Sequence, residues 1–593
     1  MLIKEQTEII QDQIIEYCNK NLPVATINIE WSPIPFSGEW GISTSFFKLA
    51  ATEAKQLTTN GIPLIPIPER AQQIASEIAA LIGVPAGFSR VEPVNGYLNL
   101  YFISEIFSEQ VIDEILSDGD SYGCKQPNGE LVMFEFSQPN THKAFHVGHV
   151  RSAILGDVLS RIFKCAGFQV VRANYYGDIG LHVIKWLWNY INFHQGEKPP
   201  SDTTRWMGEL YAEAIKRLEE NPELETEVRE LYARWDQEDP QIVNLWRTTR
   251  QWSIDGFKDI YEKLDIEFDR DYSNSDVEKP GKQFVNELIK IGIAEDERPG
   301  GPVIVRIDDL LGLKKEKYRV LVILRSDGTA LYSTEDLALV NLKFSEYQLD
   351  HSYYVVDVRQ SLHFQQVFKT LEIAGYNGAD RCQHIPYELV NLPGNVIMAS
   401  REGTVVLLED LIREAISRAY NLVEEKNPGL SPEIKKEIAR AVGIGAIKFP
   451  ILARENTKVV TFDWKSALDF NGQAAPYIQY AHVRANSILR QINDEPEYRD
   501  LRNYELHPTE VQLIDYLSRL PSEVQRAAEE FKPLIITNLA YETARAFNDF
   551  YNQCPVLKAE PVIREFRLKL VSATRQVLAN ELKLLGITAP QLM

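Results

Sequence analysis

LVMFEFSQPNTHKAFHVGHVRSAILGD, residues 131–157, is the stretch that decides the fold of this chain. It begins with a short apolar run typical of a buried strand, passes through a polar turn, and enters a helical pattern that extends from about Val147 to Ala166. A second strand pattern follows at 168–177, FQVVRANYYG. Because neighbouring parallel strands need a crossover connection, this strand–helix–strand order predicts a parallel sheet.

The rest of the middle region continues the same pattern after an interruption. Residues at about 190–275 are charged and helical, and we interpret them as an insertion. Strand patterns return at 302–307, 318–324, 352–358 and 383–392. We therefore predict a doubly wound, Rossmann-type α/β domain over residues 116–430, with ligands at the carboxyl ends of its strands.

The two regions that flank this domain differ from it in their secondary-structure pattern. Residues 1–115 alternate helix and strand patterns, which predicts a separate α+β domain, and a Gly-, Ser- and Asp-rich linker follows. Residues 431–593 are almost entirely helical in pattern. The fold class is therefore α/β multidomain, with an N-terminal α+β domain and a C-terminal all-helical domain.

Composition narrows the class of protein. Hydrophobic residues make up 44% and charged residues 25%, which excludes a disordered or fibrous chain. The net charge of −21 argues against non-specific binding of nucleic acids, including DNA, although residues 471–593 are nearly neutral. The five cysteines are scattered and form no CxxC pair, so we interpret them as reduced cytosolic thiols without a zinc site. No apolar run is long enough to predict a membrane span.

The HVGH motif at 146–149 is the strongest candidate for a chemical site. His146 and His149 share a helical face, and the start of the helix favours a phosphate group. Gly148 allows close approach of a flat ring such as adenine. We predict that the motif stabilises charge on the α-phosphate of ATP. A metal site that recruits His142 and His182 is the alternative, although no cysteine lies nearby.

Six motifs together resemble the arginyl-tRNA synthetases, a family of class I aminoacyl-tRNA synthetases, in their order and spacing. The ending of the chain resembles the family's C-terminal anticodon-binding domain. The resemblance covers nearly the whole chain and is weakest in 1–115 and at about 190–275. The motifs are FEFSQPNTHKAFHVGHVRSAILGD (134–157), NYYGDIG (174–180), LYSTEDL (331–337), VRQSLHF (358–364), MASREGTVVLLEDL (398–411) and DFNGQAAPYIQYAHVRANSIL (469–489).

The resemblance implies an arginine pocket whose residue types suit a guanidinium group, which prefers carboxylates and polar oxygens in fixed geometry. Considered singly, each residue has an ordinary alternative: Glu135 as an exposed strand residue, Asp336 as a solvated helix charge and Tyr332 as a core aromatic. The implied pocket consists of Glu135, Asn140, Tyr332, Asp336 and Gln360.

The resemblance also implies the residues that handle ATP. Class I enzymes commonly carry a KMSKS loop, but here the corresponding stretch has Arg401 and no lysine. Lys143 resembles the lysine with which the family compensates, so we expect Lys143 and Arg401 to share the phosphate charge with Mg²⁺. The implied catalytic and ATP-binding residues are His146, His149, Lys143 and Arg401, with Gly148, Met398 and Ser400 as further ATP contacts.

Two further groups of residues complete the implied sites. The family places the turn containing Asp178 and Gly180 beside the substrate, whereas turn capping by Asp178 is the alternative; the role of His182 stays open. In the helical domain, the resemblance suggests that an aromatic and basic stretch stacks on anticodon bases, with core packing as the alternative. Its residues are Tyr477, Tyr480 and Arg484.

These inferences predict a cytosolic, monomeric arginine–tRNA ligase. Arginine, ATP with Mg²⁺, and tRNA(Arg) are the expected partners; a membrane, DNA, a tightly bound cofactor and a structural zinc are not expected. The resemblance implies that residues 1–115 contact the tRNA elbow. Three alternatives stay open: a catalytically silent tRNA-binding paralogue, suggested by the lysine-free loop, a small-molecule ligase or nucleotidyltransferase, and a synthetase for another amino acid.

Overall fold

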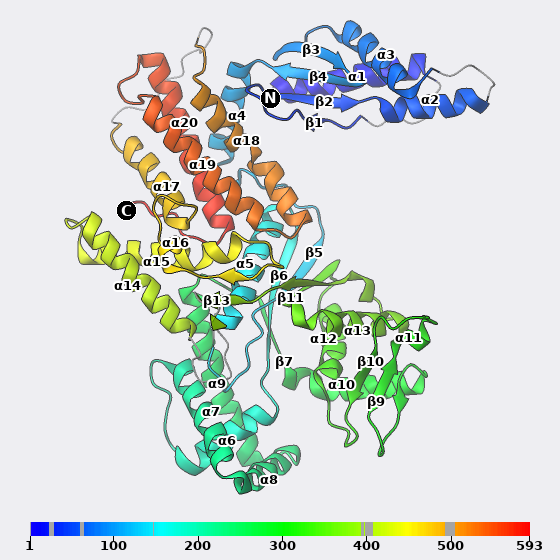
Figure 1. Cartoon of the computed structure of the whole chain (residues 1–593), viewed down its shortest axis with the longest axis vertical. Helices are drawn as coiled ribbons and strands as arrows, with labels where there is room; N and C mark the ends of the chain where they lie inside the picture. Colours follow the sequence, from blue (N-terminus) through cyan, green and yellow to red (C-terminus); the bar gives the residue numbers. More distant parts are fainter. Residues whose placement is uncertain are drawn as a thin grey trace. The chain divides into compact units, whose positions relative to one another are not determined.

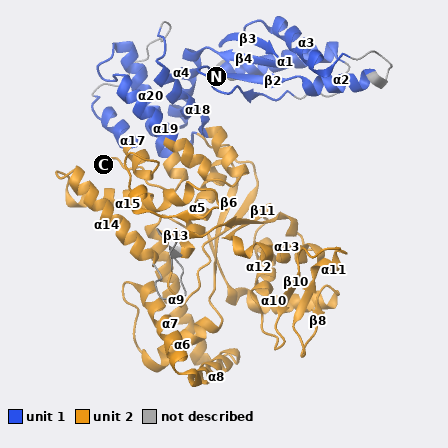
Figure 2. Cartoon of the chain, in the orientation of Figure 1, with its two compact units in different colours: residues 1–122, 481–520, 542–580 blue, residues 123–480, 521–541, 581–593 orange. Residues whose placement is uncertain are grey.

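The structure is a computed structural model, and it describes residues 2–22, 29–59, 65–145, 147–392, 396–397, 407–492 and 504–593. The chain divides into two compact units (Figure 2). The first unit comprises residues 1–122, 481–520 and 542–580, and the second comprises 123–480, 521–541 and 581–593. In the described residues, no helix is long and apolar enough to cross a membrane.

A five-stranded parallel sheet is the centre of the second unit (Figure 1), and its strand order is β12-β11-β5-β6-β7. Helix α5 (Val150–Cys165) connects β5 to β6, which confirms the strand–helix–strand prediction. Phe136 fills the space at Gly156 of this helix, where any Cβ would overlap its ring. The strands are β5 (Leu131–Glu135), β6 (Gln169–Tyr176), β7 (Arg270–Ser273), β11 (His351–Asp357) and β12 (Cys382–Tyr387).

Helices form the insertion between β6 and β7, where the sequence predicts a helical segment. Its core is rich in aromatic side chains, among which Trp186 is fully buried and stacks on Tyr190 with the ring centroids 5.2 Å apart. The helices are α6 (Leu181–Phe193), α7 (Thr203–Glu220), α8 (Glu225–Asp236) and α9 (Pro240–Lys263).

A second insertion lies between β7 and β11, and it corrects the sequence interpretation of two strands. The predicted strands at 302–307 and 318–324 do not join the doubly wound sheet; they form a separate antiparallel sheet, β10-β9-β8. Apolar runs identify strands without identifying the sheet to which they belong. The elements are α10 (Asn274–Lys290), β8 (Glu295–Asp296), β9 (Val303–Arg306), α11 (Ile307–Leu310), β10 (Val320–Leu324) and α12 (Tyr332–Glu346).

The remainder of the chain after β11 is mainly helical, as predicted for the C-terminal region. α13 (Ser361–Ile373) precedes β12, and three short strands, β13 (Val390–Leu392), β14 (Val396–Ile397) and β15 (Val460–Thr461), form a small sheet. The division between the two units falls within the last four helices. The helices are α14 (Leu408–Lys426), α15 (Pro432–Leu452), α16 (Trp464–Ala467), α17 (Ala475–Leu489), α18 (Pro508–Glu529), α19 (Leu534–Gln553) and α20 (Pro561–Leu584).

The N-terminal part of the first unit has the predicted α+β organisation, with an antiparallel sheet of order β1-β2-β4-β3. Proline begins α3 and Gly83 follows its last residue with φ +61°, a backbone conformation that glycine adopts without strain. The elements are α1 (Leu2–Asn21), β1 (Ser32–Pro33), β2 (Gly41–Ser45), α2 (Phe47–Thr59), α3 (Ile67–Ile82), β3 (Phe88–Val94), β4 (Tyr97–Phe102) and α4 (Ser104–Asp118).

A buried arginine fixes α5 to two later segments of the chain. Arg151 is 1% exposed, and burial lowers its pKa to about 10. Its guanidinium donates to the backbone carbonyl oxygens of Glu388 and Leu389 after β12, and to those of Glu455 and Lys458. The first turn of α5 is therefore held against the chain that leads toward residues 398–401.

One prediction about the cysteines is wrong. Cys124 and Cys165 form a disulfide, with their Cα atoms 4.4 Å apart. The two residues are 41 positions apart in sequence, and only the packing of the linker against the end of α5 brings them together. Backbone bonds support this packing, because Lys125 N donates to the Cys165 carbonyl at 2.8 Å. Cys18, Cys382 and Cys554 are free thiols, as predicted.

We expect three thiols per chain in the unfolded, unreduced protein. Alkylation in denaturant should label Cys18, Cys382 and Cys554, and reduction before alkylation should raise the number to five, because only the disulfide resists the reagent. Intact-mass measurement counts the labels. Five labels without reduction would show that Cys124 and Cys165 are not bonded.

Candidate active site

Glu135 lies at the carboxyl end of β5 and is buried, so its interpretation as an exposed strand residue is wrong. One carboxylate oxygen accepts from Lys343 Nζ on α12, and the other accepts from Gln138 Nε2 at 3.0 Å. Lys343 is fully buried, and its Nζ lies 3.9 Å from the ring centroid of Tyr354. Sequence reasoning missed Lys343, although a lysine within the apolar run LALVNLKF was a visible signal of a buried cation.

Asn140 packs against the turn that follows β6. Thr141 N donates to the Gly177 carbonyl at 2.9 Å, and Gly177 N donates to the Pro139 carbonyl at 3.1 Å. A Cβ at position 177 would overlap Asn140 Oδ1, so glycine is required there. The two predicted motifs, 134–157 and 174–180, are thus joined directly at the carboxyl edge of the sheet.

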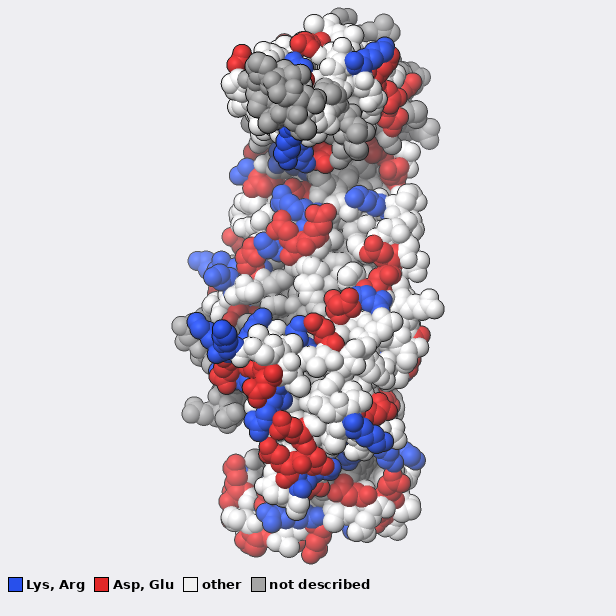
Figure 3. All heavy atoms as spheres, turned by 90° about the vertical axis from the view of Figure 1, so that its right-hand side faces the viewer, with Lys and Arg blue, Asp and Glu red and all other residues white. Residues whose placement is uncertain are grey.

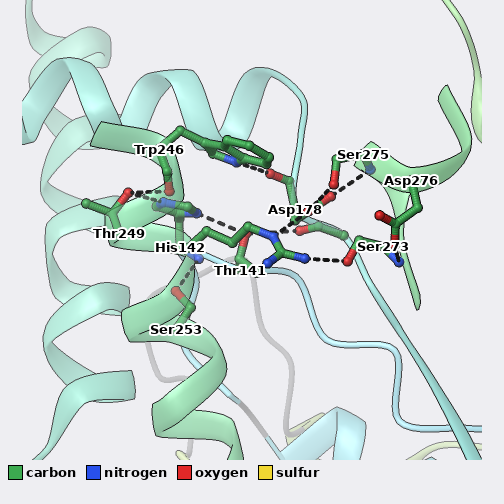
Figure 4. A network of polar contacts seen from close by, with 11 residues as sticks. Thr141, His142, Asp178, Trp246, Thr249, Ser253, Ser273, Ser275 and Asp276 are labelled. Atoms are coloured by element: carbon green, nitrogen blue, oxygen red, sulfur yellow. Dashed lines mark hydrogen bonds and ion pairs between the residues drawn. The ribbon is translucent and has the colours of Figure 1, made fainter. Parts of the chain in front are cut away.

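Asp178, in the same turn, is fully buried and surrounded by donors (Figure 4). Its carboxylate accepts from Arg250 Nε at 2.6 Å, from Ser275 Oγ at 2.6 Å and from Ser275 N at 2.9 Å. Its carbonyl accepts from Trp246 Nε1 at 2.7 Å. Asp178 therefore ties the turn to α9 and to the start of α10, which agrees with turn capping, while a contact with substrate stays a prediction. Gly180 has φ +115° and precedes α6.

His142 is a buried structural residue. Its Nδ1 and Nε2 lie 2.9 Å and 2.8 Å from the hydroxyls of Thr141 and Thr249, and burial holds its pKa well below the usual range (Figure 4). Burial, with the charge of Lys143, lowers the pKa of His182 to about 4. Within the described part of the chain, no group of three or more His, Cys, Asp or Glu side chains is arranged to hold a metal. The metal interpretation of these histidines therefore gains no support.

The phosphate-binding residues are only partly described. His146, Met398, Ser400 and Arg401 lie outside the described residues. Gly148 and His149 form part of a 3-10 turn directly before α5, so they stand at the positive end of a helix dipole. The Lys143 ammonium lies 5.0 Å from the ring centroid of Tyr211 on α7, and burial lowers the Lys143 pKa.

The N-terminal half of α12 contributes the remaining acidic group of the implied pocket. Tyr332 is 68% exposed, so its interpretation as a core aromatic is wrong. Asp336 Oδ2 lies 2.5 Å from His363 Nε2 on α13, and Gln360 is exposed immediately before that helix. The Tyr175 hydroxyl on β6 accepts from the Asn274 side-chain amide at 2.7 Å, and the same amide donates to Glu335. Burial and the charges of Asp336, Glu335, Glu135 and Asp178 raise the pKa of Tyr175.

Comparison with known proteins identifies the family. Residues 111–464 match the family described as tRNA synthetases class I (R), catalytic domain, and residues 478–593 match the DALR anticodon binding domain. The chain belongs to the arginyl-tRNA synthetase family. It is 36% identical to an arginine–tRNA ligase of Clostridium perfringens and 34% identical to one of Chloroflexus aurantiacus; each match covers 88% of this chain and 90% of the relative.

A solved structure agrees with this membership of the arginyl-tRNA synthetase family. The arginyl-tRNA synthetase of Thermus thermophilus superposes with a TM-score of 0.79 at 27% identity, and the match covers 100% of both chains. That of Plasmodium falciparum superposes with a TM-score of 0.74 at 19% identity, which supports the fold alone.

The candidate tRNA contacts lie on α17, at the start of the anticodon-binding match. In the second unit, the Tyr477 ring lies 5.4 Å from the Tyr541 ring and Tyr480 is 39% exposed. In the first unit, Arg484 Nη1 donates to Asn548 Oδ1 at 2.5 Å. Lysine and arginine are interspersed with acidic residues on the face shown in Figure 3, so charge alone marks no nucleic-acid surface on that face.

We expect Lys343→Met to destabilise the second unit by about 3–5 kcal/mol, because it leaves the Glu135 carboxylate buried without a cation. Urea denaturation measures the loss. The double variant Lys343→Met with Glu135→Leu should recover most of this stability, since it removes both charges together. Equal losses in the single and double variants would show that the ion pair is not the cause.

Proposed function

We propose that this chain is an ATP-dependent arginine–tRNA ligase. It activates L-arginine with ATP to form arginyl-adenylate and pyrophosphate, then transfers the arginyl group to the 3′-terminal ribose of tRNA(Arg). The observation that carries the proposal is the match of most of this chain to arginine–tRNA ligases, and the carboxyl groups near Tyr175 at the edge of the parallel sheet support it. A cationic amino acid is the substrate that such a cluster suits.

The activation step needs positioning and charge stabilisation and no covalent enzyme intermediate. The arginine carboxylate attacks the α-phosphorus, a new C–O–P linkage forms, and the bond to the β-phosphate oxygen breaks so that pyrophosphate leaves. His146 and His149 of the HVGH motif stabilise the negative charge that develops on the α-phosphate. Lys143 and Arg401 balance the charge of the leaving pyrophosphate.

Selection of arginine rests on paired polar contacts to its guanidinium group. Asp336 provides a carboxylate for the planar guanidinium group of arginine. Tyr332 and Gln360 are exposed and can make further polar contacts with the substrate. Glu135 is the second carboxylate of the implied pocket, and Asn140 is a polar partner for the amino and carboxylate groups of arginine. A site of this kind discriminates by about 10⁴ or more without editing, because a substrate lacking the polar group leaves the site's own buried polar groups unpaired.

Mg²⁺ enters with ATP. The described residues include no cluster of three or more metal-ligating side chains, so they do not form a site that holds this ion by themselves. The phosphates of ATP are its expected ligands, and no step is assigned to it. When bound there, it neutralises phosphate charge.

The proposed roles divide among three parts of the chain, two of which bind tRNA. Residues 1–115 contact the tRNA elbow, 116–430 form the catalytic domain with its insertion at about 190–275, and 431–593 bind the anticodon arm. Tyr477, Tyr480 and Arg484 are the candidate contacts, and the partial exposure of Tyr480 supports stacking on an unpaired base. A cytosolic location and a monomeric state stay predictions.

ATP–pyrophosphate exchange with each of the twenty amino acids, with and without total tRNA, tests the proposal. We expect exchange with arginine alone, and only when tRNA is present, as the family resemblance implies. Exchange with a different amino acid would contradict the assignment of the pocket. tRNA binding without any exchange would instead identify a catalytically silent paralogue.

Asp336→Asn should raise the KM for arginine by about 10²-fold or more and leave the KM for ATP nearly unchanged, because it removes the charge opposite the guanidinium. Steady-state aminoacylation with arginine and ATP varied in turn measures both constants. Glu372→Gln on α13, where the native carboxylate pairs with Lys369, is the control with the same loss of charge. An unchanged arginine KM in Asp336→Asn would remove Asp336 from the pocket.

A further inference from the structure

Glu335 is a buried carboxyl group in the first turn of α12, directly before Asp336. It is 7% exposed. Its carboxyl group accepts a hydrogen bond from the side-chain amide of Asn274, the first residue of α10. The same amide nitrogen lies 2.7 Å from the Tyr175 hydroxyl. Glu335 therefore lies in the group of acids that converge on Tyr175 at the carboxyl end of β6.

The neighbouring acids differ from Glu335 in one respect, since each has a basic partner within the chain. The partners are Arg250 for Asp178, Lys343 for Glu135, His363 for Asp336 and Lys282 for Glu278. Among the described residues, Glu335 forms no ion pair and has an amide donor only.

The charges that act most strongly on Glu335 are negative, while His363 on α13 pairs with Asp336. Asp336 lies on its own helix, Glu278 lies on α10, and Asp178 lies in the turn after β6. Burial and these charges raise the pKa of Glu335 to about 8, opposed only by the Asn274 hydrogen bond. Near pH 7 the carboxyl group of the free protein is therefore mostly protonated.

We propose that Glu335 is a specificity-determining residue of the arginine pocket, where it presents a second carboxyl group beside Asp336 to the guanidinium and loses its proton as arginine binds. This inference rests on the proposed function. The O–H bond of the Glu335 carboxyl breaks and the proton passes to the buffer. The guanidinium keeps all its protons, so the product is an ion pair between Glu335 and the substrate.

The proton balance fixes the direction of the pH dependence. A bound guanidinium lowers the pKa of Glu335 below its value in the free protein, so arginine competes with one proton. Arginine binding should tighten by up to about tenfold per pH unit between pH 6 and 8, and should level off above the pKa of about 8. An amino acid with a neutral side chain leaves the proton in place and gains no ion pair.

Isothermal titration calorimetry of the full chain with L-arginine tests this directly, without any variant. At pH 7, titrations in phosphate and in Tris should differ in heat by the ionisation enthalpy of the buffers multiplied by about one released proton. Arginine binding with no dependence of the heat on the buffer would overturn the inference and leave the proposed function intact. Absence of both arginine binding and arginine-dependent pyrophosphate exchange would overturn both.

Two variants assign the proton to its residue. Glu335→Gln keeps the shape and an acceptor for Asn274, and it should abolish proton release and flatten the pH profile of arginine affinity. Its arginine affinity should fall by roughly 50-fold at pH 8 and by only about twofold at pH 6, with the KM for ATP unchanged. Glu372→Gln should release the same proton as the unaltered chain. Proton release that persists in Glu335→Gln would contradict the assignment.

Discussion

The buried ion pair between Glu135 and Lys343 is the interaction on which the rest of the site depends. Its partners come from β5 and α12, which are 208 residues apart in sequence. Two charges removed from water are costly unless their geometry and further hydrogen bonds compensate, and here Gln138 and the face of Tyr354 complete the pair. Because an unpaired partner would be far more costly, the pair holds α12, the helix that carries Asp336, against the end of β5.

A second network, formed by hydrogen bonds to Asp178, fixes the turn after β6 at the carboxyl edge of the central sheet. The Asp178 carboxylate and carbonyl bring the turn after β6, helix α9 and the start of α10 together. The helical insertion therefore contributes to the site, because Trp246 and Arg250 from α9 bond to the turn that packs on Asn140. The second insertion supplies Asn274 from α10, whose side-chain amide donates to both Tyr175 and Glu335.

Local sequence predicted the parts of this site that depend on local geometry. The strand, turn and helix around HVGH follow from apolar periodicity and from the length of the crossover, and they were correct. The separate sheet β10-β9-β8 was not predictable, because 302–307 and 318–324 have the same apolar character as the strands of the central sheet. The bond between Cys124 and Cys165 and the pairing of Glu135 with Lys343 depend on tertiary contacts, which residue spacing does not encode.

The partnering of the acids also explains how an acidic pocket can select arginine over lysine. Asp178 and Glu135 near Tyr175, and Glu278 near Glu335, are already matched by an arginine or a lysine within the chain, so they shape the pocket without a strong net pull on any cation. Among the described residues, Glu335 has no basic partner, so its counter-charge must come from the substrate. A lysine ammonium is a compact point charge that is costly to desolvate, whereas a guanidinium is planar, more weakly hydrated and able to donate to Glu335 and Asp336 from different edges. Discrimination then comes from the geometry of two adjacent carboxyl groups, rather than from the total negative charge of the site.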